Sequence, residues 1–236
     1  MIATSIVRSI PTKHDRPAQG QGGQVARLDG RFRALLGAAA WAELPAAVRA
    51  RFAHRAGDDA VTSYTGAVVA CRMNRAGWLL AQVCRLIGAP LPLGRDLGMP
   101  AAVVVTEDVA SGGQHWTRLY GRPRGFPQVI RSTKRFAGVT GLEEYLGAGF
   151  GIALRVRADA TALHFDSDHY FLALGAHRLH LPRWVAPGAL TISHIDRGGG
   201  AFDFVLVLRH RWFGELIEQH CRFNDCPAGP AAGRLA

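Results

Sequence analysis

Most of this chain is a series of short segments that alternate between strand-forming and turn-forming composition. Runs rich in β-branched and aromatic residues are separated by turns such as Ser111-Gly112-Gly113 and Gly198-Gly199-Gly200. Many short strands at this spacing are typical of an antiparallel sheet that is curled or closed into a barrel. Residues 143–146 interrupt the series and are expected to be helical or irregular. The composition predicts strands over residues 61–72, 101–109, 114–120, 128–136, 151–158, 162–165, 170–174, 178–181, 190–196, 201–210 and 215–223.

Helical patterns occur mainly before these strands. Apolar residues between Phe32 and Trp41 recur at helical spacing, and Pro45 suits the first position of a second helix. Asn74 is suited to cap a further helix over residues 76–87. We therefore predict an α+β fold in which two to three N-terminal helices pack on a strongly curved, mostly antiparallel sheet or partial barrel of about nine strands.

The length of 236 residues suits a single domain. We expect this domain over residues 29–225, with disordered tails at 1–28 and 226–236. The first 28 residues lack an apolar segment of signal-peptide length, and no apolar run approaches the roughly twenty residues that cross a bilayer. The four cysteines form neither a disulfide framework nor a zinc-binding pattern, so free thiols and a cytoplasmic protein are expected.

The chain is strongly basic, with a formal net charge of +10, and nearly all of its basic residues are arginine. Arginines spread along an Ala- and Gly-rich chain are typical of compositional bias with a solvated surface. The functional alternative is an electrostatic footprint for an anionic ligand, a nucleic acid or a membrane surface. No signature of a nucleic-acid-binding module accompanies the charge, so nucleic acid is not an expected partner.

No motif of a known enzyme class is present, and the stretch His164–His169 is the first candidate for another kind of site. If it is one strand, His164, Asp166 and Asp168 share a face and could bind a divalent metal. Asp-Ser-Asp between two apolar strands is also typical of a hairpin tip, which is the interpretation we favour.

Histidines supply no further metal or cofactor candidate. His177 and His180 flank Leu179 on opposite faces of a strand, and His194 lies in a different strand. Ten histidines in a chain of this size produce such groupings by chance, so we interpret these as surface or hydrogen-bonded core residues and predict neither a metal nor a cofactor.

The expected strand over residues 114–120 has an unusual face. Gln114, Trp116, Arg118 and Tyr120 alternate along it and share one side. A row of amide, indole, guanidinium and phenol groups fits a concave lining for a ligand with an apolar body and a polar or anionic head. The alternative is an exposed face on which Arg118 stacks over the two aromatic rings. Arg222, near the end of the C-terminal hairpin, is a candidate second cation.

Several short motifs follow one another along the chain in a characteristic order and spacing. They are Phe32–Gly37, Leu44-Pro45, Val48-Arg49, Trp116-Thr117-Arg118, Leu146–Phe150, Leu181–Pro187, Phe202-Asp203-Phe204 and Gly214–Ile217. Together these motifs resemble the bacterial family named domain of unknown function 4166, over roughly residues 30–225. The resemblance implies the stand-alone form of a family that also occurs behind NAD(P)-binding dehydrogenase-like domains, and it implies no established activity.

The sequence departs from the family pattern at two acidic positions, where it has Gln114 and His194, and His220-Cys221-Arg222 replaces a Tyr-Arg-Gly-like ending. If those acids neutralise arginines inside the sheet, Arg118 and Arg222 are left without carboxylates. Such arginines need an anionic ligand, or they face water.

Three functional hypotheses follow, and they leave open whether the protein is an enzyme. The leading one is binding of a small, largely apolar ligand, with or without an anionic group, on the concave face of the sheet. Its proposed site is Gln114, Trp116, Arg118, Tyr120, His194 and Arg222. The second is a barrel-type cyclase or isomerase with His115 or His194 as general base. The third, implied by the resemblance, is an accessory module for a separate NAD(P)-dependent reductase.

Overall fold

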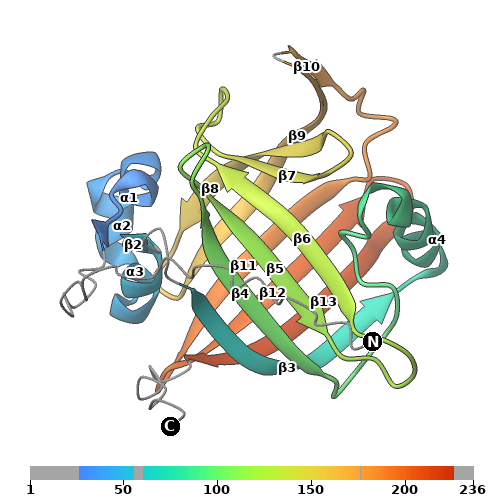
Figure 1. Ribbon diagram of the computed structural model, residues 1–236, viewed down its shortest axis with the longest axis horizontal. Helices are drawn as coiled ribbons and strands as arrows, with labels where there is room; N and C mark the ends of the chain where they lie inside the picture. Colours follow the sequence, from blue (N-terminus) through green and yellow to red (C-terminus); the bar gives the residue numbers. More distant parts are fainter. Residues whose placement is uncertain (1–26, 56–60, 176, 226–236) are drawn as a thin grey trace, which may run out of the picture.

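The computed structural model describes residues 27–55, 61–175 and 177–225, and their fold is dominated by one antiparallel sheet. The strands of this sheet are β3 (Thr62–Met73), β4 (Pro100–Asp108), β5 (Gly113–Tyr120), β6 (Gln128–Arg135), β7 (Glu143–Gly147), β8 (Phe150–Ala158), β9 (Ala162–Leu174), β10 (His177–His180), β11 (Ala189–Gly198), β12 (Ala201–His210) and β13 (Gly214–Asp225). Ten of them close into a barrel in the order β9-β11-β12-β13-β3-β4-β5-β6-β7-β8, with β8 pairing back to β9, and β10 extends one edge of β9 (Figure 1). The predicted tails fall outside the described residues except for 27–28, which form β1 (Arg27–Leu28) against β2 (His54–Arg55).

This closed barrel shows that the predicted α+β fold class is wrong. The sheet is not an open or partial barrel with two to three helices packed on it, because its first and last strands pair and leave no concave open face. The helices lie instead at the two ends of the barrel (Figure 1).

Closure depends on β9, which runs unbroken for 13 residues where the sequence predicted two strands and a hairpin tip. One edge of β9 pairs with β8, and the other pairs first with β11 and then with β10. Asp168 is the extra residue of a β-bulge, since Ser167 pairs with Leu154 and His169 pairs with Ala153. A bulge bends a strand without ending it, so turn-like composition is accommodated inside the sheet.

Strand β7 was not predicted from the sequence. It joins β6 to β8 where a helical or irregular piece was expected, so that expectation is wrong. Its two acidic residues are both buried and paired: Glu143 with Arg178, and Glu144 with Lys134. Adjacent residues of a strand point to opposite faces of the sheet, so each of these two glutamates is buried on a different face and has a cation as its partner there.

Three short helices close one end of the barrel: α1 (Arg31–Leu36), α2 (Ala38–Glu43) and α3 (Ala46–Phe52) (Figure 1). The ring of Phe32 lies edge-on to Phe52 and Phe165, with ring centres 5.2 and 6.1 Å apart. Helical periodicity in this segment was predicted correctly, and Pro45 occupies the position just before α3.

At the opposite end lie α4 (Arg75–Val83) and the 3₁₀ turn η1 (Cys84–Ile87) (Figure 1). The predicted cap is confirmed, because the Asn74 side chain accepts a hydrogen bond of 2.8 Å from the backbone N–H of Gly77. The Asn74 amide also donates to the carbonyl oxygens of Phe213 and Glu215, which ties α4 to the turn between β12 and β13.

Gly77 sets how closely α4 lies on the barrel. A Cβ at this position would lie 2.1 Å from the carbonyl oxygen of Leu216. Gly77→Ala should therefore destabilise the fold by about 1–3 kcal/mol through overpacking, although Ala normally stabilises a helix interior. Urea unfolding checks this, with Gly30→Ala as the control, because no atom lies within 4 Å of a Cβ there. A more stable Gly77→Ala variant would contradict the close approach.

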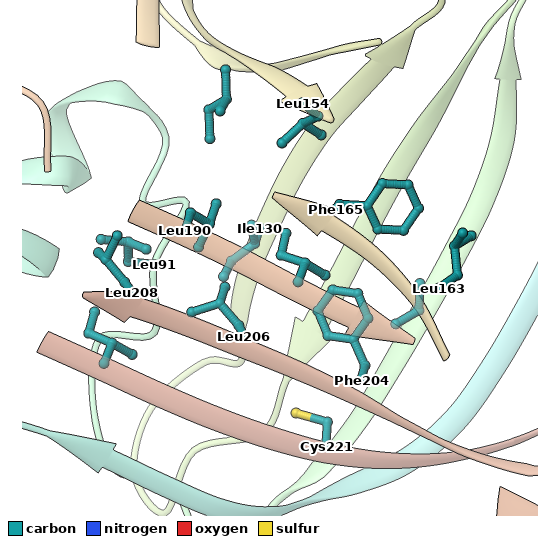
Figure 2. Close-up of a cluster of buried hydrophobic side chains, with 14 of the residues drawn as sticks. Leu91, Ile130, Leu154, Leu163, Phe165, Leu190, Phe204, Leu206, Leu208 and Cys221 are labelled. Atoms are coloured by element: carbon teal, nitrogen blue, oxygen red, sulfur yellow. The ribbon is translucent and has the colours of Figure 1, made fainter. Parts of the chain in front are cut away.

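The interior of the barrel contains one hydrophobic core, to which nearly every strand of the barrel contributes side chains. Figure 2 shows part of this core, in which Ile130 of β6, Leu190 of β11 and Leu206 of β12 lie close together and Phe165 of β9 lies farther away. In β12 the alternate residues Phe202, Phe204, Leu206 and Leu208 are buried in this core. No helix among the described residues has the length and apolar character needed to cross a bilayer.

Candidate functional site

The barrel is not filled completely, because a cavity of about 500 Å³ remains in the half nearer α4. Its walls are mainly aliphatic and come from β6, β8, β11, β12, α4, η1 and the segment 181–187. The charged or amide side chains on the walls are Arg118, Glu144 and Gln219, all buried. This volume and this apolar lining with a few polar groups are typical of small-molecule sites.

The mouth of the cavity lies between α4–η1 and the segment 181–187. Val83, Leu86 and Val185 line the cavity and are also 56%, 85% and 48% exposed. Side chains that face both the cavity and solvent mark the place where the interior opens. The cavity is therefore accessible from the end of the barrel that α4 covers.

The four residues of the predicted β5 face all point into the barrel. Arg118 and Tyr120 line the large cavity, while Gln114 and Trp116 line a smaller pocket nearer α1–α3. The alternation predicted that these side chains share one face, and the structure shows that this face is the interior and not the exposed surface of the alternative interpretation. Their role in ligand binding stays a prediction.

Arg118 marks the deep end of the large cavity. Its side chain is 8% exposed, one terminal nitrogen donates to Ser132 Oγ at 3.2 Å, and the other donates to Glu144 Oε1 at 3.3 Å. Its guanidinium lies 5.5 Å from the centre of the Phe204 ring. The buried Nε has no hydrogen-bond partner among the described residues. A buried donor of this kind is costly unless a ligand or a water accepts from it.

Lys134 and Glu144 complete a buried charge cluster with Arg118. Lys134 Nζ lies 2.9 Å from Glu144 Oε2, and both side chains are nearly inaccessible. Burial acts to raise the pKa of Glu144, but the charges of Lys134 and Arg118 outweigh it and hold that pKa at about 2. Burial lowers the pKa of Lys134. The positive charge of Arg118 lowers this pKa further, and the carboxylate of Glu144 partly opposes both effects.

This cluster corrects the expectation that Arg118 lacks a carboxylate. Gln114 is indeed not acidic, but β7 supplies Glu144 from a different strand. Neither Lys134 nor Glu144 was predicted from the sequence as a site residue, although alternation along residues 128–136 could have placed Lys134 inside. With two cations and one carboxylate, the cluster has one more positive group than negative.

His194 borders the smaller pocket, whose volume of about 40 Å³ is less than a tenth of that of the large cavity. Its ring stacks on Phe202 with centres 4.3 Å apart, and Arg51 Nη1 lies 3.5 Å from its Nε2. Burial, assisted by the charge of Arg51, lowers the pKa of His194 to about 3. The imidazole is therefore neutral near pH 7.

His115 and Arg222 lie on the outside of the barrel. The His115 side chain is 47% exposed and its Nδ1 lies 2.9 Å from Thr133 Oγ1. The Arg222 side chain is half exposed, and its Nε donates to Asp203 Oδ1 at 2.8 Å. Asp203 is fully buried on this outer side, and Arg197 contacts it as well. Arg222 therefore lies away from Arg118 and from the cavity.

The polar stretch of β9 also faces outward, and its side chains have protein partners. His164 bonds to Asp159 and Ser193, each at 2.8 Å, while Asp168 bonds to Arg155. In the described part of the chain, no three His, Cys, Asp or Glu side chains are grouped as metal ligands. His177 and His180 are exposed on β10.

These features define a class: a closed ten-stranded antiparallel barrel with an apolar internal cavity, a mouth at one end and a buried charge cluster at its deep end. Comparison with protein families places the chain more narrowly. The family described as Domain of unknown function (DUF4166) matches residues 44–223, and the chain belongs to this family. Searches of curated proteins and of solved structures find no match.

Proposed function

We propose that this barrel binds a small, largely apolar molecule in the large cavity, with its polar or anionic group at Arg118 and its apolar part toward the mouth. The observation that carries this proposal is the placement of Arg118, which is more than nine-tenths buried, lines the cavity and has an unpartnered Nε. An acidic head group would accept from that donor, and aliphatic walls would bury the rest of the molecule.

The charge balance of the cluster favours an anionic head over a neutral one. Arg118 and Lys134 share the single carboxylate of Glu144. A carboxylate arriving at Arg118 adds the second negative charge and makes the cluster neutral. Buried charges cost the least when they are paired and hydrogen-bonded, so an acid should bind more tightly than the corresponding alcohol.

No observation gives the enzyme hypothesis comparable support. His115 lies outside the barrel, and the pocket beside His194 has less than a tenth of the volume of the large cavity. Docking on a separate NAD(P)-dependent reductase stays a prediction from the family resemblance.

The proposal is tested by measuring the affinities of lauric acid and lauryl alcohol by titration calorimetry. The wild type should bind the acid about tenfold to a hundredfold more tightly, because a hydrogen bond to a charged group contributes about 1.5–3 kcal/mol. Arg118→Met should remove this preference and retain binding of the alcohol, since the Lys134–Glu144 pair stays intact in that variant.

Two further variants control for the site. Leu206→Trp places an indole in the cavity and should abolish binding of both ligands. Arg131→Met changes an exposed arginine that lies outside the cavity lining and should leave both affinities unchanged. Equal loss in Arg118→Met and Arg131→Met, or no binding of either ligand by the wild type, would refute the proposed site.

A further inference from the structure

Exposed apolar side chains lie on the segments at the end of the barrel that carries the mouth of the cavity. We call these side chains the rim, and they are Trp78, Val83, Leu86, Trp184, Val185 and Trp212, of which all but Val185 are more than half exposed. Three of the five tryptophans in the chain are in this set. Large apolar side chains exposed together at one end of a folded chain are typical of an interaction site.

Three segments bring the rim together at one end of the barrel. Asn74, at the start of α4, bonds to the carbonyl oxygen of Phe213 in the turn that contains Trp212. Ala189 pairs with Arg209, which places the segment 181–187 beside the same turn. Because Val83, Leu86 and Val185 also line the cavity, the rim and the cavity wall form a continuous apolar surface.

The charges around the rim are basic. Arg75, Arg85, Arg183 and Arg211 are exposed on the same three segments. None of the four forms an ion pair with a carboxylate of the described residues, whereas Glu215 is paired with Arg209. The end of the barrel that carries the mouth therefore combines tryptophans with uncompensated positive charge.

Tryptophan and arginine together fit one kind of partner. Tryptophan prefers the boundary between the apolar and polar layers of a bilayer, and each arginine near an anionic surface contributes about 1 kcal/mol. A protein partner would bury the rim equally well. The four unpaired arginines, however, favour a partner whose whole contacting surface is negatively charged. Charge complementarity thus favours anionic lipid headgroups.

We propose that the rim docks the mouth of the barrel onto an anionic lipid surface, so that the cavity opens toward the bilayer. The docking itself is independent of any cavity ligand, and only its purpose rests on the proposed function. In this orientation an apolar molecule passes between the bilayer and the cavity without crossing water. Together with the acidic head group proposed for Arg118, this makes acidic amphiphiles that reside in membranes the expected class of ligand.

The test is co-sedimentation of the full chain with vesicles of phosphatidylcholine mixed with phosphatidylglycerol, against vesicles of phosphatidylcholine alone. The wild type should sediment with the anionic vesicles, and added salt should release it. Arg75→Gln and Arg183→Gln should each weaken binding about fivefold. Trp184→Ser combined with Trp212→Ser should weaken it about tenfold or more. Circular dichroism checks that each variant is folded.

Matched variants elsewhere on the barrel distinguish docking from a general charge effect. Arg131→Gln on β6 and Val139→Ser in the loop after β6 change exposed residues outside the rim and should bind vesicles as the wild type does. Leu206→Trp should also bind vesicles normally while failing to take up lauric acid, so failure of the ligand proposal is separable from failure of docking.

Three results would overturn the inference. One is a wild type that does not sediment with anionic vesicles. Another is equal loss of binding in the rim variants and in the Arg131 and Val139 variants. The third is self-association in analytical ultracentrifugation that the two tryptophan substitutions abolish, because the rim would then be an interface between two copies of this chain.

Discussion

Replacing Glu144 with glutamine is expected to destabilise the barrel by about 3–5 kcal/mol. Glu144 is the carboxylate that both Arg118 and Lys134 contact, and all three side chains are less than a tenth exposed. The amide has nearly the same shape, so the loss reflects two buried cations without an anion and not a cavity. Urea unfolding of Glu144→Gln beside the wild type measures it.

The pH dependence of this loss identifies its cause. Burial already lowers the pKa of Lys134, so Lys134 is the group that can shed its charge. The unfolded chain holds this proton at higher pH than the folded variant does, so stability lost through Lys134 is recovered as the pH rises. The destabilisation by Glu144→Gln should therefore shrink in alkaline solution.

Two controls accompany this measurement. Lys134→Met added to Glu144→Gln should recover part of the lost stability, because it removes one of the two unpaired cations. Glu215→Gln breaks a partly exposed pair with Arg209 and should cost at most about 1 kcal/mol. If Glu144→Gln were no more harmful than Glu215→Gln, the buried cluster would not contribute as its geometry requires.

The local elements of this fold could be predicted from the sequence because their signals are local. Asn74 caps α4 with its own side chain, and the apolar alternation in β12 decides which residues face the core. Barrel closure could not be predicted in this way, because it depends on β3 pairing with β13, the first and last strands of the barrel along the chain. Asp168 in a bulge and Glu144 in a buried ion pair both look like interruptions until their partners are known.

Part of the candidate site could also be predicted from the sequence, namely which side chains share a face, but their charged partners could not. Alternation alone placed Trp116 and Arg118 on one face, and that face is the interior. The identity of the counter-ion required the register of three strands, since Glu144 on β7 pairs with Lys134 on β6, which in turn pairs with β5. Arg222 lies outside because it alternates along β13 with the buried Cys221 and Phe223, and it pairs on that outer side with Asp203.

His194 is expected to make the protein lose stability in mildly acidic solution. Its pKa in the folded chain is about 3, below its ordinary value of 6.5, because it is buried and lies beside Arg51. Between these two pH values the unfolded chain binds a proton at this position and the folded chain does not. Stability therefore falls as the pH is lowered through this range, by about 2 kcal/mol from pH 6.5 to pH 4.5.

His194→Phe isolates this contribution, because a phenyl ring keeps the stacking on Phe202 and cannot titrate. Urea unfolding across the same pH range should show a shallower loss of stability in the variant, whatever its stability at neutral pH. His115→Phe serves as the comparison, since that side chain is half exposed on the outer surface. Parallel pH profiles for the wild type and His194→Phe would mean that water reaches the imidazole and lets it protonate in the folded barrel.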